Sequence, residues 1–247
     1  VERLLKRNNL SFELFEAGIA AWNTLSGKPE VGLNNTEMLL ARVKDAASPP
    51  QLRAFALRLL PTMQRSAAAK GPFATLRFPK GVTVELLAGL LKIDNDDLSL
   101  ETVRVLSGHP AAGKHVLARV AKDKKKTTEL RAEAIAGLAA VANEYVADLV
   151  NLTKSPDQTV AEEALRSLRN QTLTAAQTAV IKQSARTDLT GAILSPASLG
   201  QDRPDLTDIA GWQQRLASLP GKPDLNSGRR IFHHASVALC ARCHRHS

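Results

Sequence analysis

The sequence predicts an all-α protein whose helices stack in pairs as an α-solenoid. Three observations support this prediction. Aromatic residues make up only 4% of a chain that is 44% hydrophobic, a balance that favours close helix packing through small residues. Four stretches of nine residues align without gaps, and each carries apolar residues at a helical period. They begin at residues 52, 98, 130 and 160, a spacing typical of helix-pair repeats.

The four aligned stretches share a stripe of apolar side chains at positions one, five, six and nine. Position six is Leu57, Val103, Ile135 and Leu165. Position five is Ala56, Thr102, Ala134 and Ala164. We expect the side chains at position six to be buried at equivalent places, because they form one face of a helix. The small residues at position five would let a neighbouring helix approach closely.

A further apolar segment and a turn precede each aligned stretch. The segments begin at residues 37, 84, 114 and 144, and the turns read SPP, DNDD, KKKTT and SPD. Each repeat is therefore predicted to be a helix, a turn and a second helix. The first interval is 46 residues, against 32 and 30 for the others, because residues 64–81 form an insertion.

These helix pairs resemble HEAT repeats, including the proline and aspartate turn before the second helix. The resemblance covers residues 1–185 and implies a curved surface that binds other proteins. Other paired-helix repeats are an alternative, as is a spacer that only separates functional modules.

The net charge and the sequence motifs bear on which classes of function are expected. The formal net charge is +9, but the basic residues are scattered, so we expect no specific nucleic-acid ligand. No apolar run approaches the roughly 18 residues of a membrane span. No P-loop, glycine-rich dinucleotide turn or HExxH is present, so no catalytic site is predicted. The first residues read as a helix already under way, and we expect the chain to be part of a longer protein.

Residues 186–225 differ from the repeats in composition and in hydrophobic periodicity. They contain four prolines and four glycines, and their periodicity breaks down except around GWQQRLASL. This composition predicts a linker with one short helix. Trp212 is expected to pin that helix to the last helix pair.

The two cysteines of the chain are Cys240 and Cys243, and His244 follows directly. Two thiols at this spacing can add across the two vinyl groups of a haem, and the next imidazole can ligate its iron. The motif therefore predicts haem c, anchored by Cys240 and Cys243, with His244 as the proximal iron ligand. Thiol exchange and an inert tail are alternatives. A zinc site is another, built from both cysteines and two of His233, His234, His244 and His246.

The sequence GRRIF at residues 228–232 resembles the N-terminal helix of class I cytochromes c. The resemblance implies that Gly228 and Phe232 pack against the C-terminal helix of a haem domain. Residues 226–247 are interpreted as the incomplete start of that domain. The only two methionines, Met38 and Met63, lie within the repeats, so no methionine follows the motif. Whether this chain holds haem is left open. Without haem, residues from about 226 onward are expected to lean on the solenoid or a neighbouring molecule, or to be mobile.

HEAT-like repeats followed by a CxxCH segment resemble the multidomain haem-binding proteins of planctomycetes and verrucomicrobia. In those proteins a dehydrogenase-like β-propeller often precedes the repeats. The resemblance implies the electron-transfer region of a larger exported, periplasmic protein, working with a redox partner protein or a fused dehydrogenase domain. The alternative is a protein-binding solenoid whose tail binds zinc or is inert.

Overall fold

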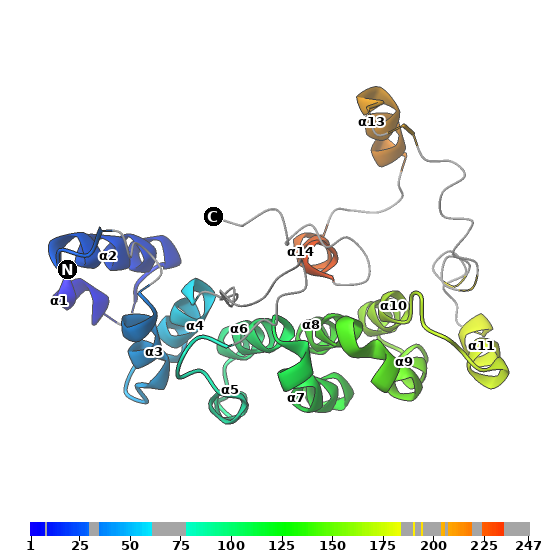
Figure 1. The fold of residues 1–247 in the computed structure, drawn as a ribbon, viewed down its shortest axis with the longest axis horizontal. Coiled ribbons are helices and arrows are strands. Elements are labelled where there is room, and N and C mark those ends of the chain that lie inside the picture. The colour runs from blue at the N-terminus through cyan, green and yellow to red at the C-terminus, as the bar shows by residue number, and fades with distance from the viewer. Residues whose placement is uncertain are drawn as a thin grey trace, which may run out of the picture. The chain divides into compact units, whose positions relative to one another are not determined.

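The computed structural model describes residues 1–7, 9–29, 35–60, 78–183, 190, 194, 204–205, 207–218 and 224–234. All regular secondary structure within these ranges is helical, and none of it is a strand (Figure 1). The predicted all-α class is therefore confirmed. The chain divides into two compact units, Val1–Gly137 and Leu138–Ser247, at the last turn of helix α8.

The first unit is a succession of short helices. They are α1 (Glu2–Leu5), α2 (Phe12–Leu25), α3 (Thr36–Lys44), α4 (Pro50–Leu59), α5 (Val84–Leu90), α6 (Asp96–Ser107), α7 (Pro110–Lys122) and α8 (Thr128–Leu138). The predicted pairs α3 with α4 and α5 with α6 pack together, and α4 also packs on α6. The second helices of these two pairs, α4 and α6, are thus direct neighbours.

The predicted turns supply the residues at which the second helices begin. In the turn DNDD, the side chain of Asn95 accepts a hydrogen bond of 2.9 Å from the backbone N–H of Leu98 at the start of α6. In the turn SPP, Pro50 is the first residue of α4, where its missing N–H costs nothing. In the turn KKKTT, the hydroxyl of Thr127 accepts from the backbone N–H of Leu130 in α8.

The aligned stretches form the buried core, as predicted. The side chains of Leu57, Val103, Ile135 and Leu165 are each at most 1% exposed. At position five, Ala56, Thr102, Ala134 and Ala164 are fully buried. The apolar stripe read from the sequence therefore faces the inside of its unit in all four stretches.

A buried arginine marks the same place in two of the aligned stretches. Arg53 donates from Nε to the carbonyl of Val43 at 2.9 Å, near the end of α3. Arg131 donates from Nε to the carbonyl of Ala121 at 3.1 Å, near the end of α7. Each arginine reaches back ten residues to a helix C-terminus, where carbonyl groups lack partners within the helix. This shared contact supports the alignment of the repeats independently of the apolar stripe.

The second unit continues with the 3₁₀ helix η2 (Ala139–Glu144), α9 (Val146–Leu152), α10 (Gln158–Ser167), α11 (Ala175–Lys182), α13 (Ile209–Ala217) and α14 (Leu225–His233). Helix α10 packs on α9 and η2, and α9 also packs on α11. The turn SPD begins α10, because the side chain of Asp157 accepts from the backbone N–H groups of Thr159 and Val160.

The short helix predicted within residues 186–225 is α13, but it is held differently from the prediction. The indole N–H of Trp212 donates to the carbonyl of Asp205 at 3.0 Å, so it fixes the residues just before its own helix. Helix α13 buries none of its residues. Trp212 thus makes a local contact where a contact with the last helix pair was expected.

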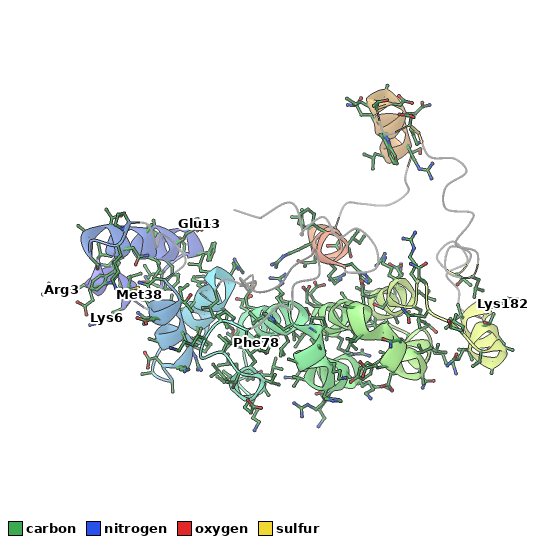
Figure 2. All side chains as sticks on the ribbon, viewed as in Figure 1. Arg3, Lys6, Glu13, Met38, Phe78 and Lys182 are labelled. Carbon is green, nitrogen blue, oxygen red and sulfur yellow. The ribbon has the colours of Figure 1, made fainter. Side chains whose placement is uncertain are left out.

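Side chains of the described residues are drawn in Figure 2, where Met38 on α3 is labelled. Met63 and most of the insertion at residues 64–81 lie outside the described residues. No described helix combines the length and the apolar character that crossing a membrane requires.

Candidate functional site

The structure describes two of the predicted haem-domain residues but not the haem-binding motif itself. Cys240, Cys243 and His244 lie outside the described residues. Gly228 and Phe232 lie on α14, the last described helix. The site can therefore be built only from α14 and from the helices that contact it.

The N-terminus of α14 is fixed by a capping aspartate. The side chain of Asp224 accepts hydrogen bonds from the backbone N–H groups of Asn226 and Ser227. It also accepts from the hydroxyl of Ser227. The hydrogen bond from the Ser227 hydroxyl, together with those from the two backbone N–H groups, holds the pKa of the Asp224 carboxyl below its usual value. The Asp224 carboxylate is therefore charged at neutral pH, and its negative charge interacts favourably with the positive N-terminal end of the α14 dipole.

The two faces of α14 differ in an unusual way. The side chains of Arg230 and His234, four residues apart, are completely buried. On the opposite side, Leu225 is 88% exposed and Gly228 is also exposed. Phe232 is half-buried. The helix thus buries charged and polar groups while it leaves apolar surface in contact with water, the reverse of an ordinary surface helix.

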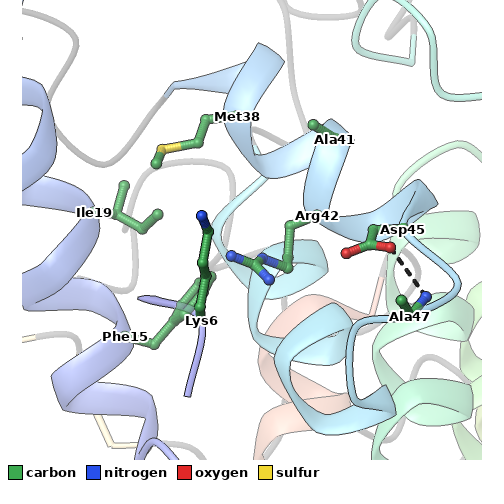
Figure 3. A pocket seen from close by; sticks show the side chains of 8 residues that line it. All are labelled: Lys6, Phe15, Ile19, Met38, Ala41, Arg42, Asp45 and Ala47. Atoms are coloured by element: carbon green, nitrogen blue, oxygen red, sulfur yellow. Dashed lines mark hydrogen bonds between the residues drawn. The ribbon is translucent and has the colours of Figure 1, made fainter. Parts of the chain in front are cut away.

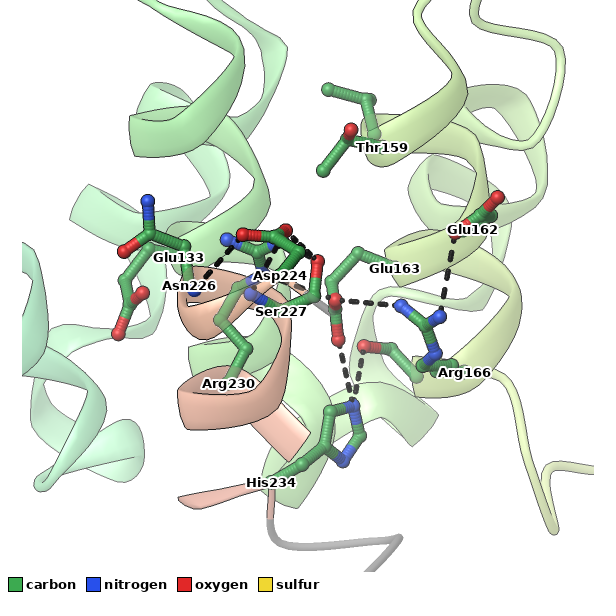
Figure 4. A network of polar contacts seen from close by, with 12 residues as sticks. Glu133, Thr159, Glu162, Glu163, Arg166, Asp224, Asn226, Ser227, Arg230 and His234 are labelled. Carbon is green, nitrogen blue, oxygen red and sulfur yellow. Dashed lines mark hydrogen bonds and ion pairs between the residues drawn. The ribbon is translucent and has the colours of Figure 1, made fainter. Parts of the chain in front are cut away.

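The buried face of α14 meets a carboxyl group of α10 (Figure 4). Arg230 donates from Nε to Oε2 of Glu163 at 3.2 Å. Arg166, one turn along α10 from Glu163, donates from Nη1 to the same oxygen at 3.1 Å. The side chains of Glu163 and Arg230 have no exposed surface. One buried carboxyl group therefore receives a guanidinium from its own helix and another from α14.

His234 completes the cluster just beyond the end of α14. Its Nε2 lies 3.3 Å from the hydroxyl of Ser167 and 3.5 Å from Oε1 of Glu163. Burial lowers the pKa of His234 to about 4, and the positive charges of Arg166 and Arg169 act in the same direction. The imidazole is thus neutral at pH 7, and its contact with Glu163 is a polar contact between a neutral ring and a carboxyl group.

Glu163 is subject to opposing influences. Burial raises the pKa of its carboxyl group, and the guanidinium groups of Arg166 and Arg230 offset part of that rise. We define Glu163, Arg166, Ser167, Arg230 and His234 as the α10–α14 cluster. Its hydrogen-bonding groups are directed at one another, so its chemistry is that of a buried contact that holds two helices together.

The structure also bears on the metal-site alternatives. Among the residues it describes, no group of three or more histidine, cysteine, aspartate or glutamate side chains could hold a metal ion. His234, one of the histidines considered for a zinc site, contacts Glu163 and Ser167. Both cysteines lie outside the described ranges, so neither haem nor zinc at the motif is tested by this geometry.

The first unit contains a pocket of about 510 Å³ between α2 and α3 (Figure 3). Its polar lining is engaged in contacts within the protein. Arg42 donates to the hydroxyl of Ser48 and to the carbonyl of Leu5, at 2.9 Å in each case. Asp45 accepts from Ser48 and from the backbone of Ala47, and Lys6 pairs with Glu2. These contacts indicate a structural role for the lining residues.

Sequence reasoning located α14 but missed the residues that hold it. Glutamate occupies position four in three of the four aligned stretches, as Glu101, Glu133 and Glu163. A charged residue repeated beside an apolar stripe was an available signal for a buried ion pair. Nothing in the local pattern indicated that Arg230 would be the partner of Glu163. Residues from about 226 onward were expected to lean on the solenoid or a neighbouring molecule, or to be mobile, and α14 shows the first of these outcomes through its contact with α10.

Comparisons with models of protein families, with curated proteins and with solved structures found no match to this chain.

Proposed function

We propose that this chain is the electron-transfer region of a larger exported c-type cytochrome protein. In this proposal residues 1–185 form a HEAT-like α-solenoid that serves as a scaffold, and the C-terminal segment begins a class I cytochrome c domain. The observation that carries the proposal is the sequence Cys240-Ala241-Arg242-Cys243-His244. It combines, within five residues, the three donor groups that covalent haem attachment requires.

The donor set fits haem c by its chemistry. The thiols of Cys240 and Cys243 would each add to one vinyl group, forming a carbon–sulfur bond while the thiol proton passes to the other vinyl carbon. The imidazole of His244 would ligate the iron on the proximal side. When bound, the haem supplies a centre that gains and loses one electron reversibly. The electron would pass between a redox partner protein, or a fused dehydrogenase domain, and an acceptor.

Helix α14 supports the proposal from the described part of the chain. The GRRIF segment lies within a nine-residue helix, so Gly228 and Phe232, four residues apart, share one face. A Cβ added at Gly228 would meet no atom of the described residues within 4 Å. Among the described residues, the surface at Gly228 thus leaves room for the close approach of another helix, as the resemblance to class I cytochromes implies. The opposite face is occupied by the α10–α14 cluster, so the two packings are compatible.

The solenoid part of the proposal is supported by contacts that recur between repeats. The equivalent bonds of Arg53 and Arg131 to preceding helix ends, and the burial of all four position-six residues, are expected if successive pairs repeat one geometry. Such a scaffold would present a protein-binding surface. The exported, periplasmic location is inferred from the motif alone, because haem c is attached outside the cytoplasm in bacteria.

The test is covalent haem attachment in the full-length protein that contains this chain, produced in a bacterial periplasm with its haem-maturation system. We expect a pyridine haemochrome spectrum and haem that survives extraction with acidified acetone. Cys243→Ala should weaken or abolish attachment, and His244→Ala should remove the proximal ligand. His246→Ala, two residues along, is the matched control and should keep the haem. A matured protein without haem absorbance that binds one zinc ion through Cys240 and Cys243 would overturn the proposal in favour of a protein-binding solenoid with a zinc tail.

A further inference from the structure

The contact between α14 and α10 has the properties of a specific docking site. A helix of nine residues has little stability in water on its own and depends on tertiary contacts. Its apolar Leu225 is exposed, and Ile231 and Phe232 are only half-buried, so apolar side chains supply only part of those contacts. Among the described side chains of α14 and its C-terminal cap, those of Arg230 and His234 are completely buried, and both reach α10. The most deeply buried contacts that hold α14 on α10 are therefore polar.

Charge complementarity explains why α14 is accepted at this place. A carboxyl group buried in a protein interior is costly unless several donors surround it. Within the repeats, Glu101 meets this need with Arg58 and Arg104, both from repeat helices. Glu163 has Arg166 from its own helix, and the second guanidinium is Arg230 from α14.

Arg230 is held in the geometry that the contact requires before it meets α10. Its Nη2 donates to the hydroxyl of Ser227 at 2.9 Å, and Ser227 donates in turn to the capping carboxylate of Asp224. A guanidinium fixed on its own helix loses less side-chain freedom when it docks. The cap, the serine and the arginine thus act together to present one donor to Glu163.

We propose that the face of α10 formed by Glu163, Arg166 and Ser167 is the docking site for α14, and that it fixes the start of the C-terminal segment to the repeats. Cys240 follows His234 by six residues. A chain spans at most about 3.5 Å per residue, so Cys240 lies within about 20 Å of His234 when α14 is docked. The docking claim is independent of haem, and only its use, the placement of a haem-bearing segment on the scaffold, rests on the proposed function.

Hydrogen exchange of the full chain, followed by mass spectrometry at pH 7, tests this proposal without haem. The test variants are Glu163→Gln and Arg230→Gln. The matched controls are Arg229→Gln, at the half-exposed position beside Arg230, and Glu16→Gln, at a half-exposed position on α2. Glu162 is unsuitable as a control because its carboxylate lies 3.4 Å from Nη2 of Arg166. We expect the test variants to open α14 about 100-fold more often, because each removes the buried ion pair between Glu163 and Arg230 that joins α10 to α14. The controls should change this opening by less than about threefold.

The double variant Glu163→Gln/Arg230→Gln distinguishes a direct pair from two separate effects. If the two residues act through one contact, the double variant should open α14 no more than the worse single variant does. Equal effects of test and control variants would overturn the proposal, as would additive effects in the double variant. Exchange of α14 in the wild-type chain at the rate of an unstructured peptide would also overturn it.

The amides of α9 and α10 serve as an internal reference in the same experiment. If Glu163→Gln also increases their exchange, α10 itself is disturbed, and Arg230→Gln then decides the question because its substitution lies on α14. If the test variants open α14 as expected but the periplasmic protein carries no haem, the docking proposal is supported and only its role in electron transfer is contradicted. If test and control variants behave alike but the periplasmic protein carries covalent haem, the docking proposal is contradicted and the haem proposal is supported.

Discussion

Glu101 in the first unit and Glu163 in the second occupy the same position of two aligned stretches, and both are buried, but their partners come from different places. Glu101 lies 2.8 Å from Nη2 of Arg58 on α4 and 2.7 Å from Nη1 of Arg104 on its own helix. Glu163 also has an arginine three residues along its helix, Arg166. Its other arginine is Arg230, 67 residues away in sequence.

This difference shows how one repeated residue can serve two purposes. In the first unit the glutamate links neighbouring repeat helices, since Arg104 also lies 3.5 Å from Glu133 on α8. The result is a chain of alternating charges along α4, α6 and α8. In the second unit the equivalent glutamate binds a segment from outside the repeats. A buried pair of this kind contributes more to the choice of partner than to net stability. Four predictions test how far the contrast holds.

The largest effect is expected from Arg104→Ala in the first unit. This change removes the guanidinium that two buried carboxyl groups, Glu101 and Glu133, share. We expect it to lower the free energy of unfolding of this unit by about 3 kcal/mol. The measurement is hydrogen exchange of the α6 amides in increasing urea. Arg119→Ala, an exposed arginine on α7, is the control and should cost less than about 0.5 kcal/mol. Similar losses for both arginines would show that the alternating charges do not stabilise the unit.

The second prediction concerns pH and applies only to the α10–α14 cluster. An undocked His234 titrates near 6.5 and the docked one near 4, so the undocked state binds the proton more tightly. As pH falls below about 6.5, docking of α14 should weaken progressively until about pH 4, by at most about 3 kcal/mol. Protonation of Glu163, whose pKa is raised by burial, acts in the opposite direction and reduces the total.

Hydrogen exchange of α14, corrected for intrinsic rates, measures this dependence between pH 4 and pH 7. His234→Gln should remove the His234 contribution in this window while it keeps a polar side chain near Ser167. The helices of the first unit provide the reference, because Ser167 and Glu163, which His234 contacts, both lie in the second unit. A pH profile of α14 that is the same with and without His234 would contradict the assignment.

A third, intermediate effect tests what the two stretches share. Ala134 and Ala164 are both fully buried at position five. Replacing either with leucine should cost roughly 1–3 kcal/mol, because the larger side chain must displace a closely packed helix. Ala136→Leu is the control, at a half-buried position two residues from Ala134. Chemical denaturation measures all three variants. Unchanged midpoints for Ala134→Leu and Ala164→Leu would show that these alanines do not lie at a close helix contact.

The smallest predicted effect is a gain in the stability of α8. The third stretch has Ala136 at position seven, where the others have Arg58, Arg104 and Arg166. Ala136→Arg would place a guanidinium three residues after Glu133, which should stabilise α8 by about 0.3 kcal/mol. Ala136→Gln, which is long and polar but uncharged, should give no such gain. Thermal unfolding of the two variants side by side is the measurement. A loss of stability with arginine but not with glutamine would show that this place does not accept a positive charge.

Much of the fold followed from patterns that are local in the sequence. Apolar spacing identified the second helices at residues 52, 98, 130 and 160, and turn residues such as Asn95 and Asp157 cap the helices that follow them. Such signals act within a few residues, so a single chain reveals them. The motif at residues 240–244 is likewise local, and its haem function stays a prediction.

The contact of Trp212 was the clearest error in this reading. Trp212 was expected to hold the short helix against the last helix pair, but its indole N–H donates to the carbonyl of Asp205, seven residues earlier. A short-range hydrogen bond needs no ordering of a long loop, and it therefore competes well with a distant partner.

The sequence by itself determined which residues form helices and which side of each repeat helix is buried, because both depend on neighbours within one or two turns. Only the tertiary structure decided that α14 buries Arg230 and His234 while Leu225 is exposed. An apolar pattern predicts burial against an apolar surface, whereas α14 meets the buried carboxyl group of Glu163. The partner of a buried charge is set by which groups the folded chain brings within about 3 Å, and that proximity has no trace in local periodicity.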